Sequence, residues 1–456
     1  MIEPPVSRRL RVFAFDPSLS TRLETETINE LTLHIPWEQL DLGPVGEYIE
    51  VVDVDPASSC YYNPVDLNHP HLLAQDGLPP TESNPQFHQQ MVYAVAMTTI
   101  REFERALGRV ALWSDRTRRL ASGEYIDQFV RRLRMYPHAL RDRNAYYSPS
   151  KKALLFGYFP ITFKDEHNTP GTLVFNCSSH DIIAHEVTHA LLDGVHPRFN
   201  EPTNPDVHAF HEAFADIVAL FQHFSYPDVL ESQINATHGS LQAENLLSQL
   251  AQQFGRATGR GSALRDALGG INPKTEAWEP QKPDPHALDK TFEPHDRGSI
   301  LVAAVFRAFL SIYRASSADL FRIASSGTGI LPEGALHPDL TRRLAKEAAK
   351  CASRILQMCI RAIDYCPPVD ITFGDFLRGI LTADLDYVPE DTAGYRTVFI
   401  QSFREWGIYP RGVSSMGIDD LIWPSGDDLF KDLKNREPDQ VGAKSYMEMD
   451  LIKAAR

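Results

Sequence analysis

Residues 181–194 read DIIAHEVTHALLDG, and residues 185–189 within them form an HExxH pattern. On a helix, positions i and i+4 lie on the same face, so His185 and His189 can both reach one metal ion while Glu186 stays beside it. The apolar residues spread through the stretch favour a helix. The pattern therefore predicts a helix that carries two metal ligands and an adjacent carboxylate.

The third ligand has to come from elsewhere, because a catalytic zinc needs three protein ligands and one open position. A histidine in HxxGxxH register is excluded, since the third residue after His189 is Leu192. The better candidate is Glu212 in residues 211–221, HEAFADIVALF, far enough along the chain for a loop and a return helix. Asp216 follows one helical turn later, so we expect it to accept the free ring N–H of a ligand histidine.

Strand-like and helix-like patterns divide the chain into a β-rich first part and an α-rich second part, which indicates an α+β protein with two lobes. We expect a β-rich lobe over residues 1–194 that ends in the HExxH helix, a helical lobe over 195–411 that carries the third ligand, and an extension over 412–456. The predicted strands cover residues 11–15, 31–35, 48–54, 109–113, 153–158 and 172–175. The predicted helices cover residues 88–107, 181–192, 209–224, 243–254, 299–315, 340–363, 372–382 and 397–406.

The two metal-binding stretches resemble the zinc helix and the third-ligand helix of the thermolysin-like gluzincin metallopeptidases. The resemblance extends in order from about Tyr48 to Tyr409. It implies a zincin fold in which a β-rich N-terminal lobe and a mainly α-helical C-terminal lobe enclose the metal site. It also implies one Zn²⁺ per chain, held by His185, His189 and Glu212.

Three further segments resemble substrate-binding segments of this family. Residues 144–147, NAYY, resemble the edge strand whose asparagine and alanine bond the substrate backbone. Residues 262–265, SALR, resemble the segment whose arginine grips the substrate carbonyl, and residues 294–300, PHDRGSI, the segment whose histidine stabilises the transition state. Ile182 and Leu264 are expected to line an apolar pocket for the residue after the cut. The residues expected to contact substrate are Asn144, Ala145, Ile182, Leu264, Arg265 and His295.

The expected activity is peptide hydrolysis by a zinc-activated water, with Glu186 as general base and an apolar residue preferred after the cut. The chain departs from the family between His189 and Glu212, where it lacks the family's oxyanion-binding tyrosine. A non-catalytic or latent zinc protein that binds peptides therefore stays open. An aminopeptidase of the same clan also stays open, with Glu201 or Asp206 as the acidic group for a free amine.

Calcium is not expected to be required. Asp181 matches one ligand of the family's double calcium site, but Gln222 and His223 stand where an acidic ligand is expected.

The cysteines and the remaining histidines contain no second metal motif. Five cysteines at irregular spacing supply neither a disulfide framework nor a CxxC pair. His69, His71 and His88 have no helical ligand spacing among them. Spacing along the sequence therefore gives no reason to expect a second site.

Composition narrows the choice of partners. The 456 residues include 45 Lys+Arg and 60 Asp+Glu, a formal net charge of −15, which argues against nucleic acid or an anionic membrane as the main partner. A peptide or protein substrate is expected instead. No stretch approaches the ~18 apolar residues of a membrane span. The N-terminal residues lack a secretory apolar region, so we expect a cytoplasmic protein, with non-classical export and the oligomeric state left open.

Overall fold

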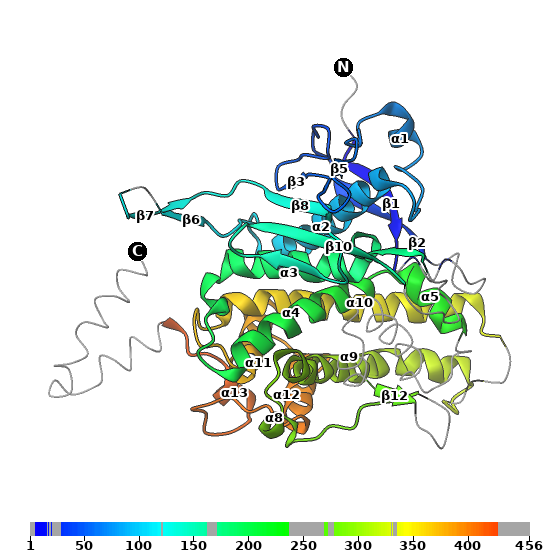
Figure 1. Ribbon diagram of the computed structural model, residues 1–456. Helices are drawn as coiled ribbons and strands as arrows, with labels where there is room; N and C mark the ends of the chain where they lie inside the picture. Colours follow the sequence, from blue (N-terminus) through cyan, green and yellow to red (C-terminus); the bar gives the residue numbers. More distant parts are fainter. Residues whose placement is uncertain are drawn as a thin grey trace.

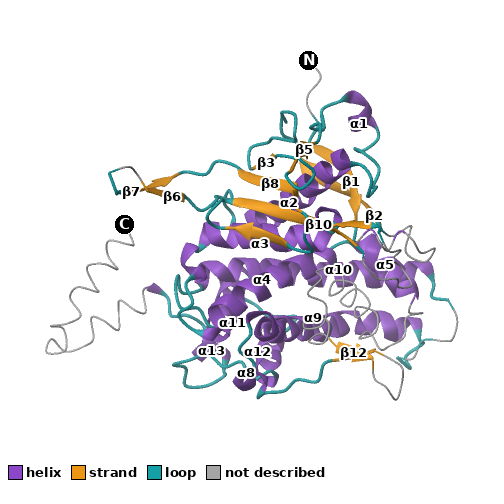
Figure 2. Ribbon diagram, viewed as in Figure 1, coloured by secondary structure: helices purple, strands orange, loops and turns teal. Residues whose placement is uncertain are grey.

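The chain folds as an α+β protein with a strand-rich N-terminal region and a largely helical C-terminal region, as a computed structural model shows (Figure 1). Figure 2 shows most strands lying together above a stack of long helices. The structure describes residues 5–15, 17, 20, 29–119, 122–161, 171–236, 269–271, 278–329, 331 and 335–426.

The largest sheet has the order β11-β10-β8-β3, and the additional strand β9 pairs with β10. β10 runs parallel to β8 and antiparallel to β9 and β11, which pair with its first and second halves respectively. A separate antiparallel pair joins β1 and β2. The strands of these two sheets are β1 (Ser7–Phe13), β2 (Glu30–Pro36), β3 (Ile49–Val51), β8 (Leu133–Leu140), β9 (Ala145–Ser148), β10 (Ala153–Pro160) and β11 (Leu173–Phe175).

Three small hairpins complete the strands: β4 (Val54–Asp55) with β5 (Cys60–Tyr61), β6 (Arg116–Arg119) with β7 (Tyr125–Gln128), and β12 (Gly269–Ile271) with β13 (Trp278–Pro280).

Two long helices of the N-terminal region pack together next to the large sheet. α2 (Pro85–Leu107) begins after Asn84, whose side chain caps the helix, and ends at Gly108 in the left-handed conformation that glycine favours. α3 (His180–Val195) carries the HExxH residues and is preceded by the short 3-10 helix η3 (Asn176–Ser178).

The remaining helices build the C-terminal region, with α4 at its centre in contact with α3, α9 and α10. On α4, Phe210 and Phe214 pack against Phe376 of α11, and Phe214 also meets Phe103 of α2. Burying each such ring contributes about 1.5–3 kcal/mol. These helices are η4 (Pro197–Asn200), α4 (Pro205–His223), α5 (Pro227–Ala236), α8 (Ala287–Lys290), α9 (Pro294–Ala324), α10 (Pro338–Ala362), η5 (Ile363–Tyr365), α11 (Phe373–Tyr387), α12 (Tyr395–Glu405) and α13 (Ile418–Leu421), while the short α1 (Pro70–Ala74) lies in the N-terminal region.

The long helix α9 is a core helix that meets α4 closely. Among the described residues it is the helix long and apolar enough to cross a membrane, but 78% of its most apolar window is buried inside the fold. A Cβ atom on Gly298 would lie 2.7 Å from the carbonyl oxygen of Ala209, so only glycine permits this approach. The contact brings His295, at the start of α9, next to α4.

The predicted helices that fall on described residues are confirmed, most of them longer than expected at their ends. The strand predicted over residues 109–113 is wrong: among the described residues this stretch belongs to no strand, and β6 begins only at Arg116. Its backbone instead packs against α3, where a Cβ on Gly194 would lie 2.0 Å from the Leu112 carbonyl oxygen. The helix predicted over residues 243–254 lies outside the described residues, and β8 and α5 were not predicted.

Candidate metal centre

Two packed helices supply the metal-binding residues that the sequence predicts. α3 presents His185 and His189 one turn apart, and α4 presents Glu212. The helices lie against each other because both are apolar over most of their surface, with Val187 and Ala213 fully buried. Residues 22 or more positions apart in sequence thereby meet at one point.

The potential ligand atoms form a compact triangle. Nε2 of His185 and Nε2 of His189 lie 3.0 Å apart, and Oε2 of Glu212 lies 3.5 Å from the first and 3.7 Å from the second. A tetrahedral zinc ion with bonds near 2.0 Å sets such atoms about 3.3 Å apart. This buried His-His-Glu group can hold a metal ion, and its two nitrogens and one oxygen suit zinc.

The outer ring nitrogens of both histidines are occupied, which fixes the rings. Nδ1 of His185 lies 2.7 Å from Oδ1 of Asp216, and Nδ1 of His189 lies 2.7 Å from Nδ1 of His211. Burial lowers the pKa of His211 to about 4, so its ring is neutral near pH 7 and can accept the N–H of His189. With the outer nitrogens so engaged, the inner nitrogens, which lie 3.0 Å apart, can both present lone pairs to a metal ion.

His211 is a site residue that sequence reasoning missed. It immediately precedes Glu212, but nothing in its spacing connects it with His189, which is 22 residues away. Only the packing of α3 on α4 reveals the contact.

Glu212 carries a negative charge in this setting. Burial would raise its pKa, but His189, His185 and His295 outweigh burial and hold the pKa of Glu212 well below its usual range. Its side chain remains 22% exposed, in contrast to the nearly buried histidines. The centre is therefore anionic and accessible from one side, as a metal site with an open position requires.

Glu186 projects from α3 toward the strand β9. Its Oε2 accepts a hydrogen bond of 2.9 Å from the backbone N–H of Tyr147 in β9, and the residue is only 3% exposed. The carboxylate is thus held by a main-chain donor on the strand that the sequence predicts to bind substrate.

A buried polar network holds β9 against α3. Asp193, near the end of α3, accepts hydrogen bonds of 2.7 Å from the Tyr147 hydroxyl, 2.7 Å from Nζ of Lys152 and 3.0 Å from the Asn200 amide. Burial and the Asp193 charge raise the pKa of Tyr147, so the phenol stays protonated and donates. This network, which sequence reasoning also missed, joins β9, the turn that precedes β10, α3 and η4.

The residues predicted to contact substrate fall into two groups. Nδ1 of His295 lies 3.3 Å from Oε2 of Glu212, and its side chain is 42% exposed beside the metal centre. Asn144 is exposed where β9 begins, Ala145 is buried in that strand, and Ile182 is buried on α3 one turn before His185. Leu264 and Arg265 lie outside the described residues.

The acidic residues named for an aminopeptidase are differently placed. Asp206 binds Arg297 through its Oδ1, 2.7 Å from Nε and 2.5 Å from Nη2, and its Oδ2 accepts the backbone N–H of Phe373. Its carboxylate is therefore engaged in joining α4 to α9 and α11. Glu201 is exposed at the end of η4.

The residues considered for calcium form a buried polar cluster. Oδ1 of Asp181 lies 3.1 Å from Nδ1 of His223, and both side chains are almost fully buried. Gln222 meets His180 at 3.2 Å and accepts the Thr99 hydroxyl at 3.0 Å. Asp181 is thus paired with a histidine side chain.

Comparison with known proteins adds no assignment to this geometry: no protein-family model matches the chain, and no curated protein matches it.

Proposed function

We propose that this chain is a zinc-dependent metallopeptidase of the thermolysin-like gluzincin type, an endopeptidase that prefers an apolar residue after the cut. The observation that carries the proposal is the triangle of His185, His189 and Glu212 with the Glu186 carboxylate on the same helix. A purely structural zinc site needs no neighbouring base. Here the described residues supply three ligands and a base.

Zinc in this triangle would supply Lewis-acid chemistry, by acidifying a water molecule and polarising the scissile carbonyl. Glu186 takes the proton of the attacking water as general base and delivers it to the leaving amine. Its hydrogen bond from the Tyr147 N–H holds the carboxylate in place. Asp216 and His211 keep the two ligand rings oriented.

The peptide is bound as an added strand along β9. Among the described strands, β9 pairs only with β10. Along its other edge the Tyr147 N–H is taken by Glu186, and the edge beside Ala145 can take an extended chain. Asn144 and Ala145 supply the contacts at the start of this edge, and Ile182 contributes to the apolar pocket. The expected partner is therefore an extended segment of a peptide or protein.

His295 stabilises the oxyanion that develops on the scissile carbonyl, together with Arg265. Its position supports this role, because the half-exposed ring stands beside Glu212 on the accessible side of the centre. Removing one oxyanion donor typically costs a factor of about 10²–10³ in rate.

The test is cleavage of a diverse peptide mixture by purified, zinc-loaded protein, read by mass spectrometry beside the Glu186→Gln variant. Internal cuts before bulky apolar residues that disappear in the variant, while zinc stays bound, are the expected result. Stepwise loss of N-terminal residues would replace the endopeptidase with an aminopeptidase. A zinc-loaded wild type that binds peptides without cutting them would refute catalysis and leave a peptide-binding zinc protein.

A further inference from the structure

We propose that His88, His138 and Cys177 form a second metal site, which takes one divalent borderline transition metal ion of the Zn²⁺ class and has a structural role. The site lies in the N-terminal region and rests on its own contacts, so it stands whether or not the chain is a peptidase. It joins three elements: α2 carries His88, β8 carries His138, and η3 carries Cys177.

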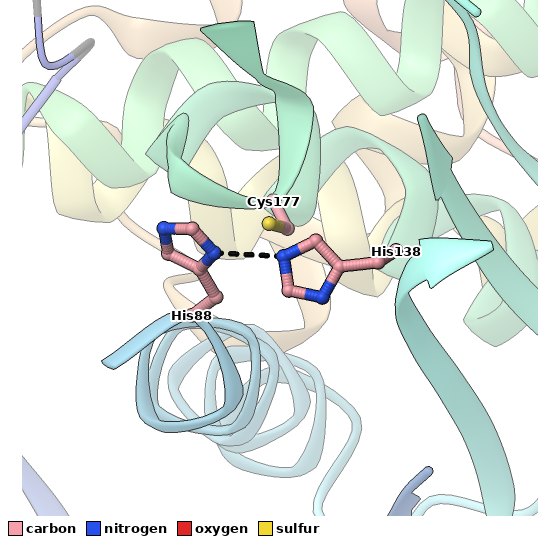
Figure 3. Close-up of side chains that lie close together, drawn as sticks. All are labelled: His88, His138 and Cys177. Atoms are coloured by element: carbon pink, nitrogen blue, oxygen red, sulfur yellow. Dashed lines mark hydrogen bonds between the residues drawn. The ribbon is translucent and has the colours of Figure 1, made fainter. Parts of the chain in front are cut away.

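The three potential ligand atoms converge on one point. Nδ1 of His88 lies 2.9 Å from Nε2 of His138, and all three ligand atoms lie within 4.8 Å of one another. Figure 3 shows the Cys177 sulfur directed toward the gap between the two rings. Ligand atoms of a tetrahedral zinc ion stand about 3.3 Å apart or slightly more, so a small opening of the ring–ring contact admits the ion.

The outer contacts of His138 are those of a metal-binding histidine. Its Nδ1 lies 2.6 Å from Oδ1 of the buried Asp53, whose Oδ2 accepts a 2.7 Å hydrogen bond from the Gln89 amide. A carboxylate that takes the outer N–H leaves the inner nitrogen with its lone pair and raises its basicity. Asp53 therefore directs Nε2 of His138 toward His88 and Cys177.

A divalent ion balances the charges of the loaded site. Each ring donates a nitrogen lone pair and stays neutral, while the Cys177 thiol loses its proton to solvent and binds as thiolate. The thiolate and the Asp53 carboxylate together carry two negative charges, which one divalent ion neutralises. Two imidazoles and one thiolate favour zinc-class ions over calcium or magnesium, which prefer oxygen ligands.

The burial of its three ligand side chains excludes a catalytic role for this site. His88 and His138 are each 1% exposed and Cys177 is fully buried, so no substrate reaches the sulfur. The Phe175 ring stands 4.7 Å from the His88 ring and 5.5 Å from the His138 ring, and Tyr62 stands 4.9 Å from His138. An ion held in this dry aromatic shell fixes structure. Because α3 begins at His180, the bound ion anchors the start of α3, the HExxH helix, to the sheet.

Cobalt substitution distinguishes the two centres, because a cysteine thiolate bound to Co²⁺ gives an intense near-ultraviolet charge-transfer band and a His-His-Glu site does not. The metal-free full-length chain is titrated with Co²⁺, the spectrum is recorded, and bound metal is counted. We expect two ions per chain and a thiolate band in the wild type. Cys177→Ser should bind one ion per chain and lack the thiolate band. His189→Gln should also bind one ion per chain but retain the thiolate band.

The matched control is Cys359→Ser, which removes another buried cysteine on α10 and should leave both ions and the band intact. Asp53→Asn keeps every ligand and should weaken the thiolate site about 10–100-fold. If Cys177→Ser does not fold, Asp53→Asn and the wild type still decide the question. A wild type that shows no thiolate band, or a band that survives in folded Cys177→Ser, overturns the proposal. A wild type that shows the thiolate band but binds no ion that depends on His189 would count against the His185, His189 and Glu212 centre and leave the second site standing.

Discussion

Replacing Asp216 by asparagine tests the His-His-Glu centre directly, because it removes a charge and leaves all three ligands in place. Oδ1 of Asp216 lies 2.7 Å from Nδ1 of His185. The two side chains are only 2% and 15% exposed, so solvent screens this contact little. Outer partners of metal-binding histidines typically change affinity about 10–100-fold. We therefore expect the zinc Kd of Asp216→Asn to rise about 10–100-fold.

The assay is a competitive zinc titration against a chromophoric chelator, with the wild type and Asp216→Asn measured side by side. Asp419→Asn is the matched control, since it makes the same substitution at an exposed position on α13. Circular dichroism checks that each variant is folded. The control should bind zinc as the wild type does, because it removes the same charge far from the ligands in sequence and outside α3 and α4.

An unchanged zinc Kd in folded Asp216→Asn would refute the reasoning that this carboxylate orients His185. An equal weakening of zinc binding in Asp419→Asn would also refute it, because the effect would then come from net charge and not from the contact between Asp216 and His185.

Four further outcomes are expected. Lys152→Met should lower the free energy of unfolding in urea by about 3 kcal/mol, because it leaves the buried Asp193 charge without its cation. Adding Asp193→Asn should restore most of the loss. A Lys152→Met variant as stable as the wild type would contradict this prediction. The free energy of unfolding should fall as pH drops below about 6.5, because burial lowers the pKa of His180 to about 3 and the unfolded chain then binds more protons than the folded chain. His180→Gln should reduce the slope of the unfolding free energy against pH by up to about 1.4 kcal/mol per pH unit. An unchanged slope in this variant would argue against the assignment to His180. His295→Ala should lower kcat by about 10²–10³ with zinc still bound, and a normal kcat would remove His295 from the mechanism. EDTA should abolish peptidase activity and Zn²⁺ alone should restore it, whereas a need for added Ca²⁺ would contradict the sequence-based expectation.

Local patterns made much of this protein predictable. A helix places residues four apart on one face, so the position of His185 relative to His189 follows from sequence alone. The same holds for Glu212 and Asp216 on α4. The structure brings these residues together at 2.7–3.7 Å. The β-rich and α-rich parts were likewise readable, because their periodicities differ along the chain.

Contacts between distant segments were not predictable in this way. The strand expected over residues 109–113 has a suitable apolar composition, but it pairs with no strand in the part of the chain that the structure describes, and its backbone packs on Gly194 instead. β8 was overlooked although it is the strand that joins β3 to β10. Strand pairing depends on neighbours far along the chain, so composition alone does not decide it.

The sequence by itself determined the HExxH pattern, the helices that carry it and Glu212, and the α+β character, because each depends on residues within a turn or two of one another. Only the tertiary structure decided that His211 faces His189, that Tyr147 holds Glu186, and that His88, His138 and Cys177 meet. Those contacts join helices and strands whose separation along the chain carries no periodic signal. The packing of apolar faces brings them together, and that packing exists only once the whole chain has folded.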